Sequence, residues 1–114
     1  MTDCIFCKIA EGTIPADKVY EDELVVAFRD LNPKAPVHVL VIPRKHIATL
    51  NDLTEEDHAV LARLQWVATR VAQQEGIAED GYRTVMNCNA DGGQSVYHVH
   101  LHVLGGRQME WPPG

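Results

Sequence analysis

Apolar residues recur along the chain with two different spacings, and each spacing predicts a different kind of element. The segment CIFCKIAEG places three apolar residues at helical spacing before a glycine, which predicts a short helix. From Thr54 to Gly76, apolar residues return every three or four positions, which predicts one long amphipathic helix that begins at a capping-box pattern, Thr54-x-x-Asp57. Its buried stripe is expected to consist of Val60, Leu61, Leu64, Val67, Ala68 and Val71.

The remaining apolar segments are short and predict strands. DKVYEDELVVAFRD predicts two strands around an acidic turn at 21–23, and VHVLVIP predicts a third that ends at Pro43. GYRTVMNCN and VYHVHLHVL predict the fourth and fifth, joined by the six residues ADGGQS. Because the connections are short, the predicted fold is α+β, a five-stranded antiparallel sheet with both helices on one face. One domain is expected over residues 1–114, with an irregular tail at 105–114.

Composition narrows the classes of protein and partner. The net charge is −6 with a pI near 5.4, and the sequence has no cluster of Lys or Arg, so no nucleic-acid partner is expected. The apolar runs are too short to span a bilayer, and the start MTDCIFCKIAEG does not resemble a secretion signal. We therefore expect a cytoplasmic protein without a membrane partner. Three cysteines are an odd number, which argues against a closed disulfide framework.

The strongest chemical signal is the alternation of histidines in YHVHLHVL. Side chains two positions apart on a strand point to the same face, so His98, His100 and His102 should line one face about 6.5–7 Å apart. The intervening residues, together with Tyr97, should face the helices. A solvated polar face would explain one such histidine. Three of them leave two chemical interpretations, a metal site that uses two of the histidines, or catalysis by an imidazole nucleophile.

Neighbouring residues favour phosphate chemistry. The segment DGGQS directly precedes the histidines, and glycines let backbone N–H groups approach an anion closely while Ser95 adds a hydroxyl. Asn87 ends the preceding predicted strand, and His38 lies in the third one. Together these residues describe an anion site beside a nucleophilic histidine.

HVHLHVL fits the pattern His-φ-His-φ-His-φ-φ, with φ apolar, and so resembles the histidine triad family of nucleotide hydrolases and transferases. The similarity runs from IFCKI through APVHVLVIPRKHI to GGQSVYHVHLHVLGGRQMEWPPG, and is greatest to the adenosine phosphoramidase branch. It implies hydrolysis of purine nucleoside 5′-phosphoramidates, and of aminoacyl-adenylates, through a covalent His–AMP intermediate. It also implies that catalysis needs no metal ion.

The resemblance also implies a role for individual residues. His100 would be the nucleophile, His102 would contact the phosphate, Ser95 would bond the leaving nitrogen, and His38 would support the triad. The substrate-binding set would comprise Asp30, Leu31, Phe6, Ile9, Phe28, Asn87, Gly93, Gln94, Ser95, His100, His102 and Trp111. Asp30 would bind the ribose, and Phe6, Ile9, Phe28 and Leu31 would flank the base.

Two further features follow from the resemblance. A homodimer is implied, with the tail reaching the partner's active site, which would give Met109 and Trp111 a surface to cover. Cys4-x-x-Cys7, with His46 and His98, matches a structural zinc site of some family members. Two plain thiols beside a short helix are the other interpretation of that pair.

The main alternative function is a nucleotide-binding regulatory module with little turnover. A metal-dependent hydrolase that uses two triad histidines is another, and chelators would abolish its activity. A dinucleoside polyphosphate hydrolase would usually carry glutamine at the third triad position, where this chain has His102.

Overall fold

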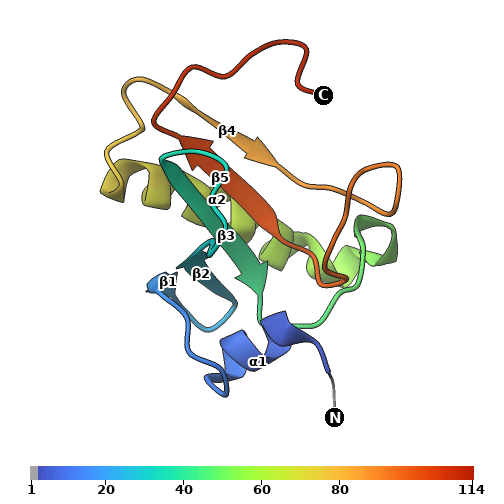
Figure 1. Ribbon diagram of the computed structural model, residues 1–114. Coiled ribbons are helices and arrows are strands. Elements are labelled where there is room, and N and C mark those ends of the chain that lie inside the picture. Colours follow the sequence, from blue (N-terminus) through green and yellow to red (C-terminus); the bar gives the residue numbers. More distant parts are fainter. Residues whose placement is uncertain (1–2) are drawn as a thin grey trace.

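The computed structural model describes residues 3–114, and its elements follow the predicted order (Figure 1). They are α1 (Ile5–Glu11), β1 (Lys18–Glu21), β2 (Val25–Arg29), β3 (Val37–Pro43), α2 (His58–Gln74), β4 (Tyr82–Val85) and β5 (Leu101–Gly105), with 3₁₀ turns at Leu50–Asp52 and Glu55–Asp57. The five strands form one antiparallel sheet in the order β1-β2-β3-β5-β4. This confirms the predicted fold class.

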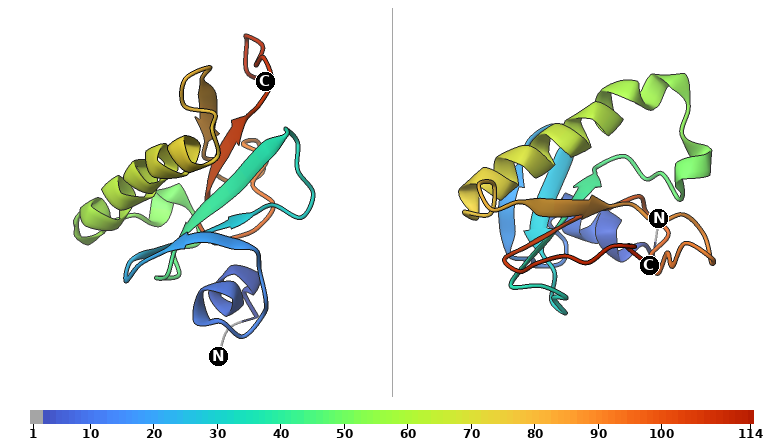
Figure 2. Two further views of the ribbon diagram at one scale, coloured as in Figure 1. Left: turned by 90° about the vertical axis from the view of Figure 1, so that its left-hand side faces the viewer. Right: turned by 90° about the horizontal axis from the view of Figure 1, so that it is seen from above.

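The expectation that both helices cover one face of the sheet is wrong, because α1 and α2 lie on opposite faces. Val25, Ala27, Val39 and Val41 pack in one core cluster with α2, whereas their neighbours Val26, Phe28, Leu40 and Ile42 pack in a second cluster with α1. Figure 2 shows the two helices on different sides of the sheet. The reason lies in the central strands, because β2 is buried at four consecutive positions and β3 at six. A strand buried on both faces is apolar throughout rather than at alternate positions.

The predicted capping box closes the 3₁₀ turn Glu55–Asp57, which leads directly into α2. The Asp57 carboxylate accepts hydrogen bonds from the Thr54 backbone N–H (2.9 Å) and hydroxyl (3.3 Å). Lys45 pairs with the same buried carboxylate at 2.6 Å. The hydrogen bond from Lys45 is the main cause that lowers the pKa of Asp57. The helix start is thereby tied to the loop that follows β3.

The last two strands are shorter than predicted. β4 ends at Val85 and β5 begins only at Leu101. The connection at 86–100 is therefore much longer than the predicted six-residue turn. The alternation still continues upstream of β5. Val99 joins the core cluster under α2 with Leu101 and Val103, while His98 and His100 are buried on the α1 side. Tyr97, expected to face the helices, is 47% exposed.

The irregular tail begins at Gly106, since β5 includes Gly105. It runs beside β4, where Arg83 donates to the Glu110 carbonyl (2.9 Å) and its guanidinium lies over the Trp111 ring. In Figure 1 this tail is at the opposite end of the molecule from α1. No helix within residues 3–114 is long and apolar enough to cross a membrane.

Two leucines offer a matched test of the core under α2. Leu64 is 2% exposed in that core and Leu31 is 98% exposed. We expect Leu64→Ala to lower the free energy of unfolding by about 2–5 kcal/mol, because it removes buried methyl groups and leaves a cavity. Leu31→Ala should change it by less than about 0.5 kcal/mol. Urea denaturation followed by circular dichroism measures both, and similar losses in the two variants would contradict this assignment of the core.

Candidate active site and metal centre

The triad histidines lie on the α1 side of the sheet, at the end where β5 begins. Phe6 of α1 packs its ring edge-on against His98 (5.9 Å between ring centroids) and His100 (5.2 Å). His100 in turn lies 4.9 Å from His102. The expected common face is therefore confirmed, although only His102 belongs to a regular strand.

A hydrogen bond to the backbone sets the tautomer of His100. Its Nδ1 lies 2.8 Å from the carbonyl oxygen of His98. A carbonyl oxygen can only accept, so Nδ1 carries the proton in the neutral ring and Nε2 keeps a free lone pair. A neutral imidazole with an unprotonated Nε2 is the form that can attack an electrophile.

The tautomer of His102 is set by a chain of hydrogen bonds through His38. The backbone N–H of Lys34 donates to His38 Nδ1 at 3.0 Å, so neutral His38 carries its proton on Nε2. That nitrogen lies 2.9 Å from His102 Nδ1, to which it donates. The free nitrogen of His102, Nε2, consequently bears a proton that it can donate to a ligand.

Burial keeps this pair uncharged. Burial lowers the pKa of His38, and burial followed by the charges of His100 and His38 lowers the pKa of His102 to about 4. His102 is therefore neutral near pH 7 in the free protein and acts as a hydrogen-bond donor. His102, which the resemblance places against the phosphate, would therefore bind it as a neutral donor.

Asp30 lies beside His38 and His102. The four residues expected to flank the base differ in exposure. The Asp30 carboxylate is 3.5 Å from His38 Nε2 and accepts from the Asn32 backbone N–H at 2.8 Å. Leu31 is almost fully exposed. The other three belong to the core cluster under α1, each less than a tenth exposed: Phe6, Ile9 and Phe28.

The glycine-rich loop is braced by the side chain of Gln94. This buried amide donates to the carbonyls of Ala48 (2.8 Å) and Val96 (3.0 Å) and accepts from the Asn89 N–H (2.8 Å). The backbone N–H groups of Gly93 and Gln94 also donate within the loop. Gln94 thus holds the loop in place, and the next residue, Ser95, is exposed.

The two remaining predicted substrate residues are Asn87 and Trp111. Asn87 is half-buried, two residues beyond the end of β4. Trp111 is 80% exposed in the tail, where its ring lies under the guanidinium of Arg83 on β4. The structure does not bring Trp111 to the triad of its own chain.

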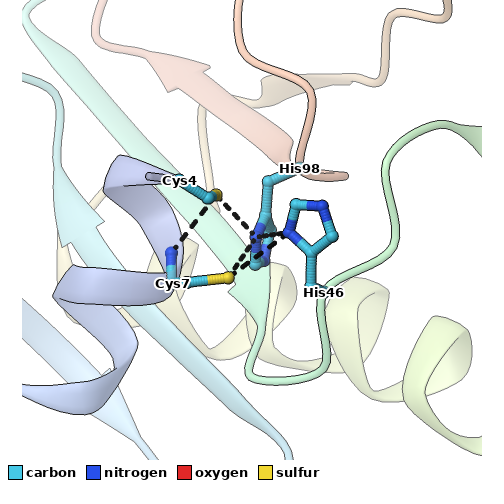
Figure 3. A group of neighbouring side chains, drawn as sticks. All are labelled: Cys4, Cys7, His46 and His98. Atoms are coloured by element: carbon cyan, nitrogen blue, oxygen red, sulfur yellow. Dashed lines mark hydrogen bonds between the residues drawn. The ribbon is translucent and has the colours of Figure 1, made fainter. Parts of the chain in front are cut away.

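The four residues expected to bind zinc converge on one point. Figure 3 shows Cys4 and Cys7 at the start of α1, His46 from the loop after β3 and His98 from the segment before β5. Their ligand atoms all lie within 4.8 Å of one another. The Nε2–H of His98 donates to the Pro43 carbonyl (2.8 Å), so the lone pair of Nδ1 faces the two sulfur atoms.

The separations in this cluster fit a tetrahedral zinc ion. Zn–S bonds of 2.3 Å and Zn–N bonds of 2.0–2.1 Å imply N···S edges of about 3.5 Å and N···N edges of about 3.3 Å. Cys4 Sγ lies 3.3 Å from His98 Nδ1, Cys7 Sγ lies 3.3 Å from His46 Nδ1, and the two nitrogens are 3.2 Å apart. The Cys7 N–H also donates to Cys4 Sγ (3.4 Å), an outer contact that orients a ligand.

Comparisons with known proteins bear on the family and the fold of the chain. A model of the HIT domain matches residues 11–109. The chain belongs to the HIT family. This HIT protein is 54% identical to the purine nucleoside phosphoramidase of Escherichia coli K12, over 94% of its own length and 90% of that relative. An uncharacterized HIT-like protein of Synechococcus elongatus is 55% identical over 98% of this chain and 97% of its own.

Solved structures of HIT proteins share the fold. A HIT family hydrolase from Legionella pneumophila superposes with a TM-score of 0.96 at 58% identity, covering 98% of this chain and all of its own. A histidine triad protein from Clostridium difficile gives 0.93 at 45% identity, over 96% of each chain. The family and the fold class predicted from the sequence are confirmed.

Besides the His98 carbonyl that bonds His100, three contributors to the HIT site were not found from the sequence. They are backbone groups, namely the Lys34 N–H on His38, the Pro43 carbonyl on His98 and the Ala48 carbonyl on Gln94. Their side chains carry no signal, because any residue supplies the same N–H or C=O. Only the pairing of β3 with β5 and the course of the loop after β3 bring them to the histidines.

The lowered pKa of His102 predicts a pH dependence of stability. Folding lowers this pKa from 6.5 to about 4, so below pH 6.5 the unfolded chain gains a proton that the folded protein does not. The stabilisation is complete above pH 6.5 and is lost towards pH 4. We expect His102→Gln to reduce the fall in unfolding free energy between pH 7 and 5 by roughly 1–2 kcal/mol.

Urea denaturation at several pH values measures this slope. His58 lies exposed on α2, so His58→Gln serves as the matched control and should leave the slope unchanged. A wild-type slope in His102→Gln would show that other groups cause the acid sensitivity.

Proposed function

We propose that the protein is a hydrolase of purine nucleoside 5′-phosphoramidates that releases AMP through an intermediate on His100. The observation that carries this function is the hydrogen bond between His100 Nδ1–H and the His98 carbonyl, because it leaves Nε2 unprotonated. The 54% identity to a purine nucleoside phosphoramidase supports the substrate class. Aminoacyl-adenylates present the same phosphorus and are further substrates of this site.

The reaction divides into two displacements at phosphorus. The Nε2 lone pair of His100 forms a bond to the α-phosphorus while the P–N bond to the amine breaks. The departing nitrogen takes a proton from the Ser95 hydroxyl, which regains one from solvent water, and leaves as the neutral amine. Water then attacks the phosphorus of the His–AMP intermediate, and the bond to Nε2 breaks to release AMP and regenerate the neutral imidazole.

Hydrogen-bond donors in the site stabilise the phosphoryl oxygens. His102 donates through Nε2–H, and His38 holds that ring in place from behind (2.9 Å). Preorganised donors of this kind need no rearrangement as charge develops. An anionic phosphate beside His102 also raises the pKa of its imidazole, which strengthens the bond. Ser95, at the exposed end of the braced loop, donates to the leaving nitrogen.

The nucleoside is bound on the other side of the phosphate. Asp30, beside His38, accepts from the ribose hydroxyls. Leu31 is exposed next to it and can cover one face of the base, whereas Phe6, Ile9 and Phe28 form the apolar floor of the core beneath. Asn87 and the Ser95 backbone N–H complete the ribose and phosphate contacts, since the N–H groups of Gly93 and Gln94 donate within the loop.

The site is completed in a homodimer. The Trp111 ring is 80% exposed and lies against Arg83 of β4 in its own chain. Large exposed apolar groups are typical of interaction surfaces. A second copy of the chain would cover the tail, and Trp111 would then contact the substrate of that copy.

We also propose that Cys4, Cys7, His46 and His98 hold a structural zinc ion. The separations between their ligand atoms, 3.2–3.5 Å for the nitrogen–nitrogen and nitrogen–sulfur pairs, support it. Four protein ligands leave no open coordination position, so the ion would contribute stability and no catalytic water. The catalytic steps remain those of His100, His102 and Ser95.

The decisive variant is His100→Ala. We expect it to lower AMP release from adenosine 5′-phosphoramidate by about 10⁴-fold or more, because the nucleophile is lost, while AMP binding stays measurable. Chromatography measures release and calorimetry measures binding. His58→Ala, on the exposed surface of α2, is the control. Wild-type protein that binds AMP without turnover would instead support a nucleotide-binding module.

Ser95→Ala tests the role in leaving-group departure. We expect turnover of an alkyl phosphoramidate to fall by about a hundredfold, because the departing amine needs a proton or hydrogen bond. An adenylate with an aryloxide leaving group should slow by less than tenfold, since that group departs without help. Thr69→Ala on α2 removes a hydroxyl that bonds only within the helix and is the control. Equal losses on both substrates would assign Ser95 to phosphate binding instead.

A further inference from the structure

The metal cluster and the nucleophile meet in one residue, His98. Its ring nitrogen Nδ1 belongs to the cluster, 3.3 Å from Cys4 Sγ and 3.2 Å from His46 Nδ1. Its backbone carbonyl accepts the proton-bearing Nδ1 of His100 at 2.8 Å. Whatever fixes His98 therefore fixes the direction and tautomer of the attacking ring.

The ring of His98 has little freedom of its own. It is fully buried, and its Nε2–H is bonded to the Pro43 carbonyl at 2.8 Å. The backbone on its C-terminal side is also bonded, because the Val99 N–H donates to the Ile47 carbonyl at 2.7 Å. Ile47 follows the ligand His46 directly, so two ligands of the cluster sit on the two segments that this bond joins.

A cation in the cluster would link three pieces of chain that are distant in sequence. Cys4 and Cys7 belong to α1, His46 to the loop after β3, and His98 to the irregular segment before β5 (Figure 3). The segment before β5 lacks the hydrogen-bond ladder that holds a strand. Metal–ligand bonds are the strongest restraint available to it, and outer contacts of metal sites change activity by 10–100-fold when removed.

We propose that metal binding at Cys4, Cys7, His46 and His98 positions the nucleophile, so that zinc occupancy controls the turnover of the phosphoramidase. His98 acts as a positioning residue that passes the restraint from the ion to His100 through its carbonyl. This inference rests on the proposed function and on the proposed zinc site. It differs from metal catalysis, because the ion touches neither substrate nor the attacking nitrogen.

The test compares zinc-loaded protein, chelator-treated protein and His46→Ala. His46 is exposed and lies outside the catalytic group, so the variant should fold. His58→Ala is the matched control, since it removes an exposed histidine from α2. Elemental analysis gives zinc content, hydrogen exchange gives protection of the Val99 amide, and steady-state kinetics with adenosine 5′-phosphoramidate gives kcat and KM.

We expect one zinc per chain in the wild type and in His58→Ala. Loss of zinc, by chelation or in His46→Ala, should raise exchange at Val99 at least tenfold and lower kcat roughly tenfold, with KM changed less than twofold. Re-addition of zinc should restore the chelated wild type, and His46→Cys, which offers a thiolate in place of the imidazole, should recover part of both effects.

Three results would overturn the inference. The first is failure to bind zinc, and the second is unchanged exchange and kcat after zinc is lost. The third is complete loss of kcat while exchange at Val99 is unchanged, which would indicate direct metal catalysis. If zinc-loaded wild type protects Val99 yet releases no AMP, the proposed function fails, while the link between the ion and the His98 segment stands.

Discussion

The hydrogen bond from His100 Nδ1 to the His98 carbonyl is the interaction on which the rest of the site depends. A histidine two residues from its partner on an extended chain can reach that carbonyl only if the backbone is held in one conformation. The bond decides which nitrogen carries the proton, and hence whether the ring attacks or donates. Without it, either nitrogen of His100 could hold the proton, and only part of the molecules would present a free Nε2.

Because the sheet is buried on both faces, water is excluded from the surroundings of this bond. Phe6 lies on α1, and its ring contacts both His98 and His100. If both helices covered one face, the triad would face water, and hydrogen bonds to its rings would compete with solvent. Placement of α1 on the triad side shields the histidines and, in the same step, delivers Cys4 and Cys7 to His98.

The sequence predicted the features that depend on local interactions better than those that depend on contacts between distant segments. The long helix and the Thr54–Asp57 capping box just before it were predictable because they depend on local spacing and local hydrogen bonds. The unbroken apolar runs of β2 and β3 indicate a sheet that is buried on both faces. That feature was missed, because the short connections suggested antiparallel strands with one exposed face. The candidate residues of the site were named from their types and from a family resemblance. Gln94 was assigned to substrate, whereas its side chain braces the loop.

The alternation of the histidines has a chemical consequence beyond sharing a face. Each ring is fixed by a different partner, His98 by the Pro43 carbonyl, His100 by the His98 carbonyl and His102 by the Nε2–H of His38. The neutral tautomers consequently alternate, with the proton on Nε2, then Nδ1, then Nε2. One ring turns a lone pair to the thiols, the next turns one to the substrate, and the third offers a proton. A spacing of two residues is the shortest that keeps three imidazoles on one face of a strand while leaving each ring its own backbone or side-chain partner.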